Sequence, residues 1–366
     1  MLWGHLKYIF KDDECLNVII SIANACIEVG HWPSHFKKST MVIISKPNKK
    51  LYNFPKAFRP IILLNTVGKL IEKVIGERLQ FHVASNDFIH PCQLSGLKFK
   101  STINMGVILF HIIHSGWVKN LSTSTLAFDI VQFFPSLNHC LLSRIIKKAR
   151  FDNWIVSFFS NYLVDRRTNY YWNSFMSSIF DVNIGGAGSA LSPILLALYL
   201  SSLIYILEKH LKNLKIPISI ISFVNDSLFI SRSKSFDISN SHLFCKYNIL
   251  SNLLKKFSLV VKHSKTEIFH FNRSRSTFDP PLLDLSPLGG NILCLNDTWK
   301  YLGFIFDRKL IFHQHVDFYV NKSISTIKCM KIIGNSNHGI NPFQKHLLYR
   351  LCILSIALYC CSNHSP

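Results

Sequence analysis

Acidic residues are scarce in this sequence of 366 residues. Aspartate and glutamate together number 20, whereas lysine and arginine number 41, so the formal net charge is +21. This imbalance excludes no fold, but it favours a polyanionic partner, either a nucleic acid or an anionic membrane surface. A basic protein without such a partner is the simpler alternative.

Cysteine pairs with metal-binding spacing are also absent. None of the ten cysteines forms a CxxC pair, and no Cys/His cluster has the spacing of a zinc site. Scattered thiols are typical of a reducing compartment. The N-terminus carries Asp12, Asp13 and Glu14 where a signal peptide would need its apolar stretch. We therefore expect an intracellular protein of the nucleus or cytoplasm, and not a secreted one.

The sequence has only one long uncharged hydrophobic run. Residues 189–207 carry no charge and nearly reach the length of a membrane span. Pro193 and four serines interrupt the run, and no second run is equally clean. A helix buried on all sides in a protein core has the same composition. A core helix and no membrane is therefore the expectation, with a membrane protein built around this span as the alternative.

Hydrophobic periodicity predicts helices and short strands in a mixed order. At 48% hydrophobic residues, the chain is long enough for one large domain or a few subdomains around a shared core. No regular βαβ alternation is present, which favours an α+β architecture over a doubly wound parallel sheet. Helices are predicted at 14–30, 66–84, 141–149 and 241–258, strands at 126–134 and 260–271, hairpins at 216–231 and 299–310, a linker at 272–298 and a mostly helical tail from about 312.

Two carboxylates fall within apolar strands, where an unpaired charge is costly. Asp129 lies within LAFDIVQFF, and Asp226 follows Asn225 at the predicted two-residue tip of the hairpin SFVNDSLFI. Asn-Asp is favoured at such tips for conformational reasons alone, so each aspartate has a structural explanation. Held on adjacent strands, however, the pair suits a two-metal phosphoryl-transfer site, because Mg²⁺ prefers carboxylate, water and phosphate ligands.

Six segments in order carry a family resemblance. The segments are KPNKK…KAFRPIILLNTVGKLIEKVI (46–75), LAFDIVQFFPSLNH (126–139), GAGSALSPILLALYLSSL (186–203), SFVNDSLFIS (222–231), VVKHSKTEIFHF (260–271) and WKYLGFIFDRKL (299–310). They resemble the successive motifs of reverse transcriptases from non-LTR (LINE-like) retrotransposons, particularly the elements common in fungi, and the likeness runs from about residue 30 to the end. The family implies a right-hand polymerase fold with fingers, an antiparallel palm sheet flanked by helices, and a thumb.

The resemblance also implies subdomains and partners. Residues 1–30 would form an N-terminal helical extension and 31–120 the fingers. The palm would occupy 121–275, with a helical insertion at about 141–182, and residues 276–366 would hold the primer grip and a partial thumb. The implied partners are an RNA template, a DNA primer and deoxynucleoside triphosphates, with two Mg²⁺ ions, or Mn²⁺, as cofactors.

Individual roles carry over to matching positions. By the resemblance, Asp129, Asn225 and Asp226 occupy the metal-binding catalytic positions, and Lys265 would protonate the departing pyrophosphate; a lone lysine there is otherwise an ordinary charge at a strand end. Lys46 and Arg59 would grip the triphosphate through charge-assisted hydrogen bonds. The other implied positions are Phe134, which would exclude a ribose 2′-hydroxyl, Ala187, Gly188 and Ser189 beside the nascent base pair, and Tyr301, Leu302 and Gly303 in the primer grip.

Two of these positions depart from the family pattern. Asn225 stands where the family has the first of two aspartates, and Ala187 stands where it has a glutamine. The missing charge at Asn225 would weaken metal affinity and transition-state stabilisation by several kcal/mol, and about 1.4 kcal/mol is a tenfold change in rate. The chain also begins just before the fingers and ends within the thumb. We therefore expect a degenerate copy with impaired activity, and a protein that only binds RNA or an RNA–DNA hybrid is the alternative.

Overall fold

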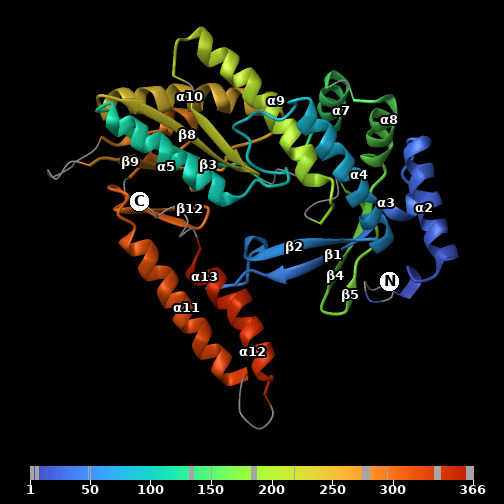
Figure 1. The fold of residues 1–366 in the computed structure, drawn as a ribbon. Coiled ribbons are helices and arrows are strands. Elements are labelled where there is room, and N and C mark those ends of the chain that lie inside the picture. Colours follow the sequence, from blue (N-terminus) through green and yellow to red (C-terminus); the bar gives the residue numbers. More distant parts are fainter. Residues whose placement is uncertain are drawn as a thin grey trace. The chain divides into compact units, whose positions relative to one another are not determined.

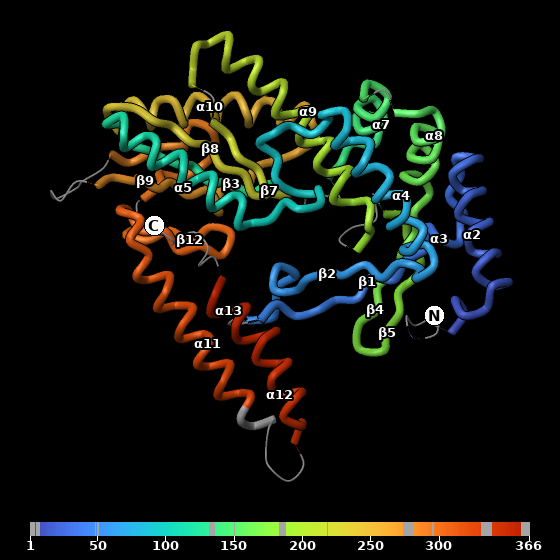
Figure 2. The backbone as a smooth tube through the Cα atoms, viewed as in Figure 1, coloured from blue at the N-terminus to red at the C-terminus, as the bar shows by residue number. Residues whose placement is uncertain are grey.

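The structure is a computed structural model. It describes residues 4, 8–47, 49, 51–131, 136–149, 151–182, 188–217, 219–273, 281–294, 296–333 and 339–359. The chain divides into two compact units, each built from three stretches of sequence. The first unit comprises Met1–Lys100, Phe128–Ser227 and Lys246–His263, and the second comprises Ser101–Ala127, Leu228–Cys245 and Ser264–Pro366. Figures 1 and 2 follow the chain through both units from blue to red.

A five-stranded sheet lies in the first unit. Its central strand β1 (Lys38–Ser45) pairs antiparallel with β2 (Phe58–Leu64) and parallel with β4 (Arg167–Trp172). The short strands β5 (Phe175–Met176) and β6 (Phe180–Asp181) both pair with β4. The parallel pairing joins two segments that are far apart in the sequence. Hydrophobic periodicity does not reveal such a pairing.

Three helices of the first unit begin at residues whose side chains cap them. The side chain of Asp12 accepts hydrogen bonds from the first-turn N–H groups of one helix, and those of Asn65 and Asn138 do the same for two others. Such caps satisfy N–H groups that lack a partner inside the helix. The helices are α2 (Asp13–Glu28), α3 (Ser34–Lys37), α4 (Thr66–Ser85), α7 (His139–Lys148), α8 (Asn153–Tyr162) and α9 (Ser192–Asn213).

Helix α9 contains most of the long apolar run. Pro193 lies in its first turn, where the missing N–H is harmless. By length and composition α9 is the one helix among the described residues that could cross a membrane, but 67% of its most apolar window is buried inside the protein. Burial of this extent is what a core helix requires.

A four-stranded sheet has the order β7–β8–β3–β9. Its strands are β7 (Ile220–Phe223), β8 (Asp226–Ser233), β3 (Ser122–Asp129) and β9 (Glu267–Phe271), and β3 runs antiparallel to β9. The division between the two units falls within β3 and within β8. The strand predicted at 126–134 in fact begins at Ser122, because polar residues before it are buried and paired.

Hydroxyl groups explain that earlier start of β3. Thr123, Ser124 and Thr125 are all completely buried. The Thr125 hydroxyl donates to the backbone oxygen of Phe269 at 3.2 Å, and Ser124 Oγ lies 2.7 Å from His270 Nδ1. Side chains that find partners across the sheet allow a polar sequence to form a buried strand.

The second unit holds helix α5 (Thr102–Val118), which begins with a capping box between Ser101 and Asn104. The hairpin β12 (Thr298–Tyr301) and β13 (Phe304–Asp307) confirms the prediction at 299–310. In Figure 1, α11 runs alongside the helices that follow it. The remaining elements that lie wholly in this unit are β10 (Leu283–Asp284), the 3₁₀ turn Ser286–Leu288, β11 (Ile292–Leu293), α11 (His313–Ile333), α12 (Pro342–Leu348), the π-helical turn Tyr349–Leu354 and α13 (Ser355–Ala357).

Most predicted elements are present with shifted ends. The mixture of helices and mainly antiparallel strands confirms the α+β class. The helix predicted at 241–258 is α10 (Phe236–Lys256), and the predicted linker at 272–298 contains the β10–β11 pair. The subdomain boundaries at 30, 120 and 275 stay predictions.

Candidate active site

Asp129 is the last residue of β3, and its side chain is 7% exposed. Its backbone oxygen accepts a hydrogen bond from Lys262 N–H at 2.8 Å, and the next residue, Ile130, forms a bridge with Val261. The strand before it is buried from its second residue onward. Packing and backbone pairing therefore place this carboxylate at the end of a rigid strand.

The hairpin between β7 and β8 brings a second acidic residue to the same place. Its two-residue tip is Val224–Asn225, and Asp226 is the first residue of β8. The tip was predicted one residue later, at Asn225–Asp226; the prediction was wrong because a positive φ of 57° makes Val224 the first turn residue. Asp226 therefore belongs to a strand.

Asn225 joins the tip to Asp129. Its Nδ2 atom donates a short hydrogen bond to Asp129 Oδ1. The backbone is joined as well, since Ile130 N–H donates to the Asn225 carbonyl at 3.4 Å. The three predicted catalytic positions Asp129, Asn225 and Asp226 thus lie together in the first unit. One carboxylate oxygen of Asp129 is already occupied by an amide N–H.

The predicted phosphate-gripping residues lie on the five-stranded sheet. Lys46 follows β1, and its Nζ donates to the Lys56 carbonyl at 2.7 Å, while Tyr52 OH donates to the Lys46 carbonyl at the same distance. Arg59 is exposed on β2 opposite Ile44. The turn between the strands is therefore closed by lysine and tyrosine contacts, and Arg59 presents its guanidinium to solvent.

The loop before α9 packs closely on β2. Gly188 has φ +137°, and a Cβ built there would lie 2.7 Å from the Ile62 carbonyl, so only glycine fits. The next residue, Ser189, is buried. Phe134 and Ala187, which were assigned to nucleotide binding, lie outside the described residues.

A buried hydrogen-bond network holds this loop, and sequence reasoning missed it. Glu72 of α4 is 1% exposed; it accepts from Tyr162 OH at 2.8 Å and from Ser189 Oγ at 2.9 Å. Burial raises the pKa of the Glu72 carboxyl, and these hydrogen bonds oppose the rise. The Arg166 guanidinium lies 4.5 Å from the Tyr162 ring centre. The available signal was the spacing of Glu72 three and seven residues before Ile75 and Leu79, on the apolar face of the helix.

The remaining predicted residues belong to the second unit. Lys265 is exposed, in a 3₁₀ turn before β9. Tyr301 ends β12 and is buried, while Leu302 and Gly303 form the turn to β13 with φ of +47° and +89°. Tyr319 OH donates to the Gly303 carbonyl at 2.8 Å. The predicted primer-grip residues are therefore contiguous on one anchored hairpin.

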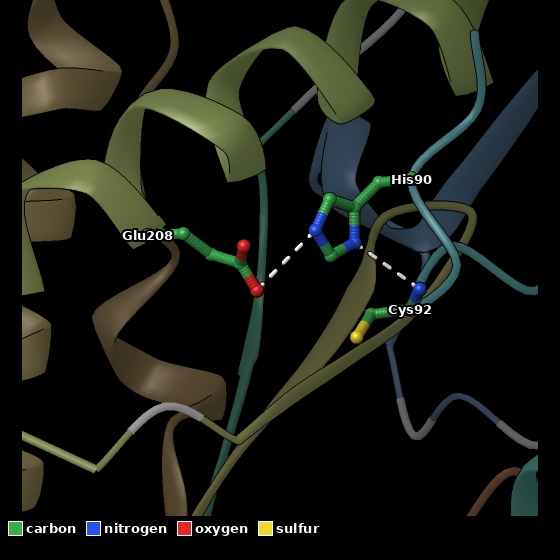
Figure 3. Close-up of side chains that lie close together, drawn as sticks. All are labelled: His90, Cys92 and Glu208. Atoms are coloured by element: carbon green, nitrogen blue, oxygen red, sulfur yellow. Dashed lines mark hydrogen bonds and ion pairs between the residues drawn. The ribbon is translucent and has the colours of Figure 1, made fainter. Parts of the chain in front are cut away.

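Among the described residues, one group of three His, Cys, Asp or Glu side chains has its ligand atoms close enough together to share a metal ion. Its members are His90, Cys92 and Glu208, and Figure 3 shows His90 between the other two. His90 Nε2 lies 3.3 Å from Glu208 Oε1, and Cys92 N–H donates to His90 Nδ1 at 3.1 Å. Since Nδ1 is the acceptor, Nε2 carries the proton and faces the carboxylate. Burial also raises the pKa of the Cys92 thiol to about 11, which disfavours the thiolate that metals bind. The cluster fits a structural hydrogen-bonded unit better than a metal site.

Known proteins resemble this chain over most of its length. The family model described as "Reverse transcriptase (RNA-dependent DNA polymerase)" matches residues 44–306. The "Probable RNA-directed DNA polymerase from transposon BS" of Drosophila melanogaster is 25% identical over 341 residues, which cover 92% of this chain and 37% of that protein. The "RNA-directed DNA polymerase from mobile element jockey" of the same fly is 23% identical over 312 residues, covering 83% and 32%. The chain thus spans about a third of the length of these curated relatives.

Solved structures share the fold at low sequence identity. Apo telomerase from Candida tropicalis has a TM-score of 0.51 at 13% identity, covering 81% of this chain and 53% of that one. A form truncated from its C-terminal domain has the same score and identity, covering 75% and 54%. This likeness confirms the right-hand polymerase fold. The relatives confirm the resemblance to LINE-like elements, whereas the fungal type stays a prediction because the named relatives are from flies.

Proposed function

Because this chain belongs to the reverse transcriptase family, we propose that it copies RNA into DNA at a site formed by Asp129, Asn225 and Asp226. One observation supports this proposal above the others: the hydrogen bond from Asn225 to Asp129 joins the hairpin tip to the end of β3. The bond brings the tip, with Asp226 as the next residue, to the end of the strand that carries Asp129. Nucleotidyl transfer through two metal ions requires carboxylates from different strands at one place, whereas a purely structural turn has no such requirement.

Reverse transcriptases use divalent metal ions, and the donor set here fits them. Asp129 and Asp226 supply carboxylate oxygens, which Mg²⁺ and Mn²⁺ prefer. We assign two Mg²⁺ ions, replaceable by Mn²⁺, to these two residues. When bound, the ions would activate the primer hydroxyl and stabilise the leaving oxygens. The protein's own part is to hold both carboxylates on paired strands.

Asn225 lowers the activity that this site supports. It leaves two carboxylates at the three catalytic positions, and its amide N–H occupies Asp129 Oδ1. A cation that binds the same oxygen must share it with that N–H, and it meets one negative charge fewer. The lost charge corresponds to several kcal/mol in a partly dehydrated site, hence to orders of magnitude in rate.

Substrate-binding roles are assigned to residues of each unit separately. Arg59 is exposed and suits bidentate binding of the triphosphate, and Lys46 would exchange the Lys56 carbonyl for a phosphate oxygen. Gly188 and Ser189 would support the nascent base pair. In the second unit, the Tyr301–Gly303 segment would hold the DNA primer, and Lys265 would protonate the leaving pyrophosphate. The proposed compartment is the nucleus or cytoplasm, where RNA templates are present.

Primer extension on an RNA template tests the proposal. We expect slow extension by the natural chain with Mn²⁺, an increase of at least about tenfold in Asn225→Asp, and no extension in Asp129→Ala. Circular dichroism should show that all three proteins are folded. Extension that persists in Asp129→Ala would place the chemistry elsewhere.

A protein that only binds nucleic acid is the second candidate. The net charge of +21 favours it independently of the catalytic residues. If all three folded proteins fail to extend a primer, binding of an RNA–DNA hybrid should still weaken steeply with salt, because contacts to phosphates release counterions. A shallow salt dependence would exclude this candidate too.

A further inference from the structure

The hairpin tip that carries Asn225 has a backbone conformation that valine rarely adopts. Val224 has φ +57°, in the left-handed region. A β-branched residue is an outlier there, because its Cβ crowds the neighbouring carbonyl. Such a conformation persists only when surrounding groups enforce it. The tip therefore needs an external contact at Val224.

Ser95 supplies that contact. Its hydroxyl oxygen accepts a hydrogen bond from Val224 N–H at 2.8 Å, and its side chain is 3% exposed. Water therefore has little access to replace this oxygen. The bond acts on the strained residue itself, one position before Asn225 and two before Asp226.

The segment around Ser95 is fixed to strand β7. Leu94 N–H donates to the Ser222 carbonyl at 2.8 Å, and Ser222 N–H donates to the Cys92 carbonyl at 2.9 Å. Gln93 lies opposite Ser222 in a parallel bridge. The segment thus extends β7 on its free side and brings Ser95 to the level of the tip.

The His90 cluster anchors the other end of this segment to α9. His90 faces Glu208 through Nε2, as Figure 3 shows, and its backbone N–H donates to Ser201 Oγ at 2.9 Å. Both partners lie on α9, the long core helix. The segment is therefore tied to a helix at residue 90, to a strand at residues 92–94, and to the tip at residue 95.

We propose that Ser95 is a positioning residue that holds the Val224–Asn225 tip in its strained turn and so sets Asn225 and Asp226 against Asp129. Without the hydroxyl, Val224 would relax out of the left-handed region, and the residues after it would rotate away from the end of β3. This inference rests on the proposed function for its catalytic consequence, but the coupling between Ser95 and Val224 does not.

The first test measures that coupling without any enzyme assay. Urea unfolding is compared for the natural chain, Ser95→Ala, Val224→Gly and the double variant. Removal of the hydroxyl lets Val224 release its strain, which offsets part of the loss, but glycine adopts a positive φ freely and has no strain to release. The loss from Ser95→Ala should therefore be at least about 1.5-fold larger in the Val224→Gly background. An equal loss in both backgrounds would overturn the proposal. The result is independent of whether the chain polymerises DNA.

The second test measures catalysis in the Asn225→Asp background. Ser95→Ala should lower kcat about tenfold or more while KM for the deoxynucleotide changes less than about twofold, because misplacement affects the reacting groups and not triphosphate binding. Val224→Gly should restore most of kcat. Ser201→Ala is the matched control, since it removes a buried serine hydroxyl at the far end of the same segment. Equal kcat losses in Ser95→Ala and Ser201→Ala would indicate general destabilisation and overturn the positioning role.

If the Asn225→Asp chain extends no primer, the catalytic test is replaced by titration of Mn²⁺, followed by electron paramagnetic resonance. Ser95→Ala should then weaken Mn²⁺ binding severalfold relative to Ser201→Ala. Identical Mn²⁺ affinities in Ser95→Ala and Ser201→Ala would overturn the inference. A lack of primer extension alone would count only against the proposed activity.

Discussion

Two tight turns, one in each unit, reverse the chain between paired strands but are stabilised by different contacts. The tip Val224–Asn225 joins β7 to β8, and Leu302–Gly303 joins β12 to β13. Only the first residue of the tip has a positive φ, whereas both residues of the second turn do. These signs correspond to type II′ and type I′ turns, the two that suit the twist of paired strands.

The turns differ in what holds them. A type II′ turn favours glycine at its first position, but the tip has Val224, and a serine hydroxyl from another segment accepts its N–H. The second turn has glycine at one position, and tyrosine hydroxyls donate to its carbonyls: Tyr359 to Leu302 at 3.0 Å, and Tyr319 to Gly303 at 2.8 Å. Leu302 also has a positive φ, so both turns hold a non-glycine residue in this region, but only at the tip is that residue's own N–H held by a hydroxyl from another segment.

The largest expected effect on the difference between the two turns comes from replacing the glycine of the second turn. In Gly303→Val, a Cβ would lie 2.8 Å from Tyr359 OH, and φ +89° would be strained for valine. Left-handed strain and overpacking together should cost about 3–4 kcal/mol of unfolding free energy, measured with urea. Gly76→Ala is the control, because its Cβ would make only ordinary 3.5 Å contacts. A loss below about 1 kcal/mol in Gly303→Val would show that this turn tolerates valine as the tip does.

A fall in pH should distinguish the two units, because burial lowers the pKa of a histidine in one unit and raises the pKa of a glutamate in the other. In the second unit, burial lowers the pKa of His270 to about 4. The folded state therefore disfavours the protonated ring: this contribution is fully present above the unfolded pKa of about 6.5 and is lost as pH falls toward 4, by up to about 3 kcal/mol. In the first unit, the raised pKa of Glu72 has the reverse sign, so acid favours its folded form.

Amide hydrogen exchange at pH 7 and pH 5 measures this difference unit by unit. Protection in β9 should fall at pH 5, while protection in α4 should not. His270→Gln, which keeps a hydrogen-bonding partner for Ser124, should remove most of the pH dependence of β9. An equal loss of protection in α4 and β9 would contradict the assignment to His270.

The turns also show how far the sequence determines the structure. The hairpin at 299–310 and the helix at 66–84 were predictable because their periodicity and turn residues agree locally. The closeness of Asp129 to the tip was predictable from the family resemblance together with two acidic residues in apolar strands. These features are local, or they follow from motif order.

Features that depend on distant partners were not predictable. The parallel pairing of β1 with β4, the burial of Glu72, and the bond from Val224 to Ser95 each join segments that are separated in sequence. The early start of β3 was missed because buried hydroxyls find partners only in the folded sheet. Sequence composition carries no record of such partners.

The smallest expected effect concerns the tyrosine that holds the second turn. Tyr359→Phe removes a hydroxyl that donates to Leu302 and also contacts Thr102 Oγ1 at 3.2 Å. The loss should be about 1 kcal/mol in urea unfolding, the usual value of a hydrogen bond of this kind. Because Tyr319 still holds the Gly303 carbonyl and Gly303 adopts its φ without strain, the turn should keep its shape, and kcat in the Asn225→Asp background should change less than about twofold. Tyr319→Phe provides a matched measurement on the neighbouring carbonyl. A drop in kcat as large as that expected for Ser95→Ala would mean that both turns depend on outside bonds for their geometry, and the contrast between them would disappear.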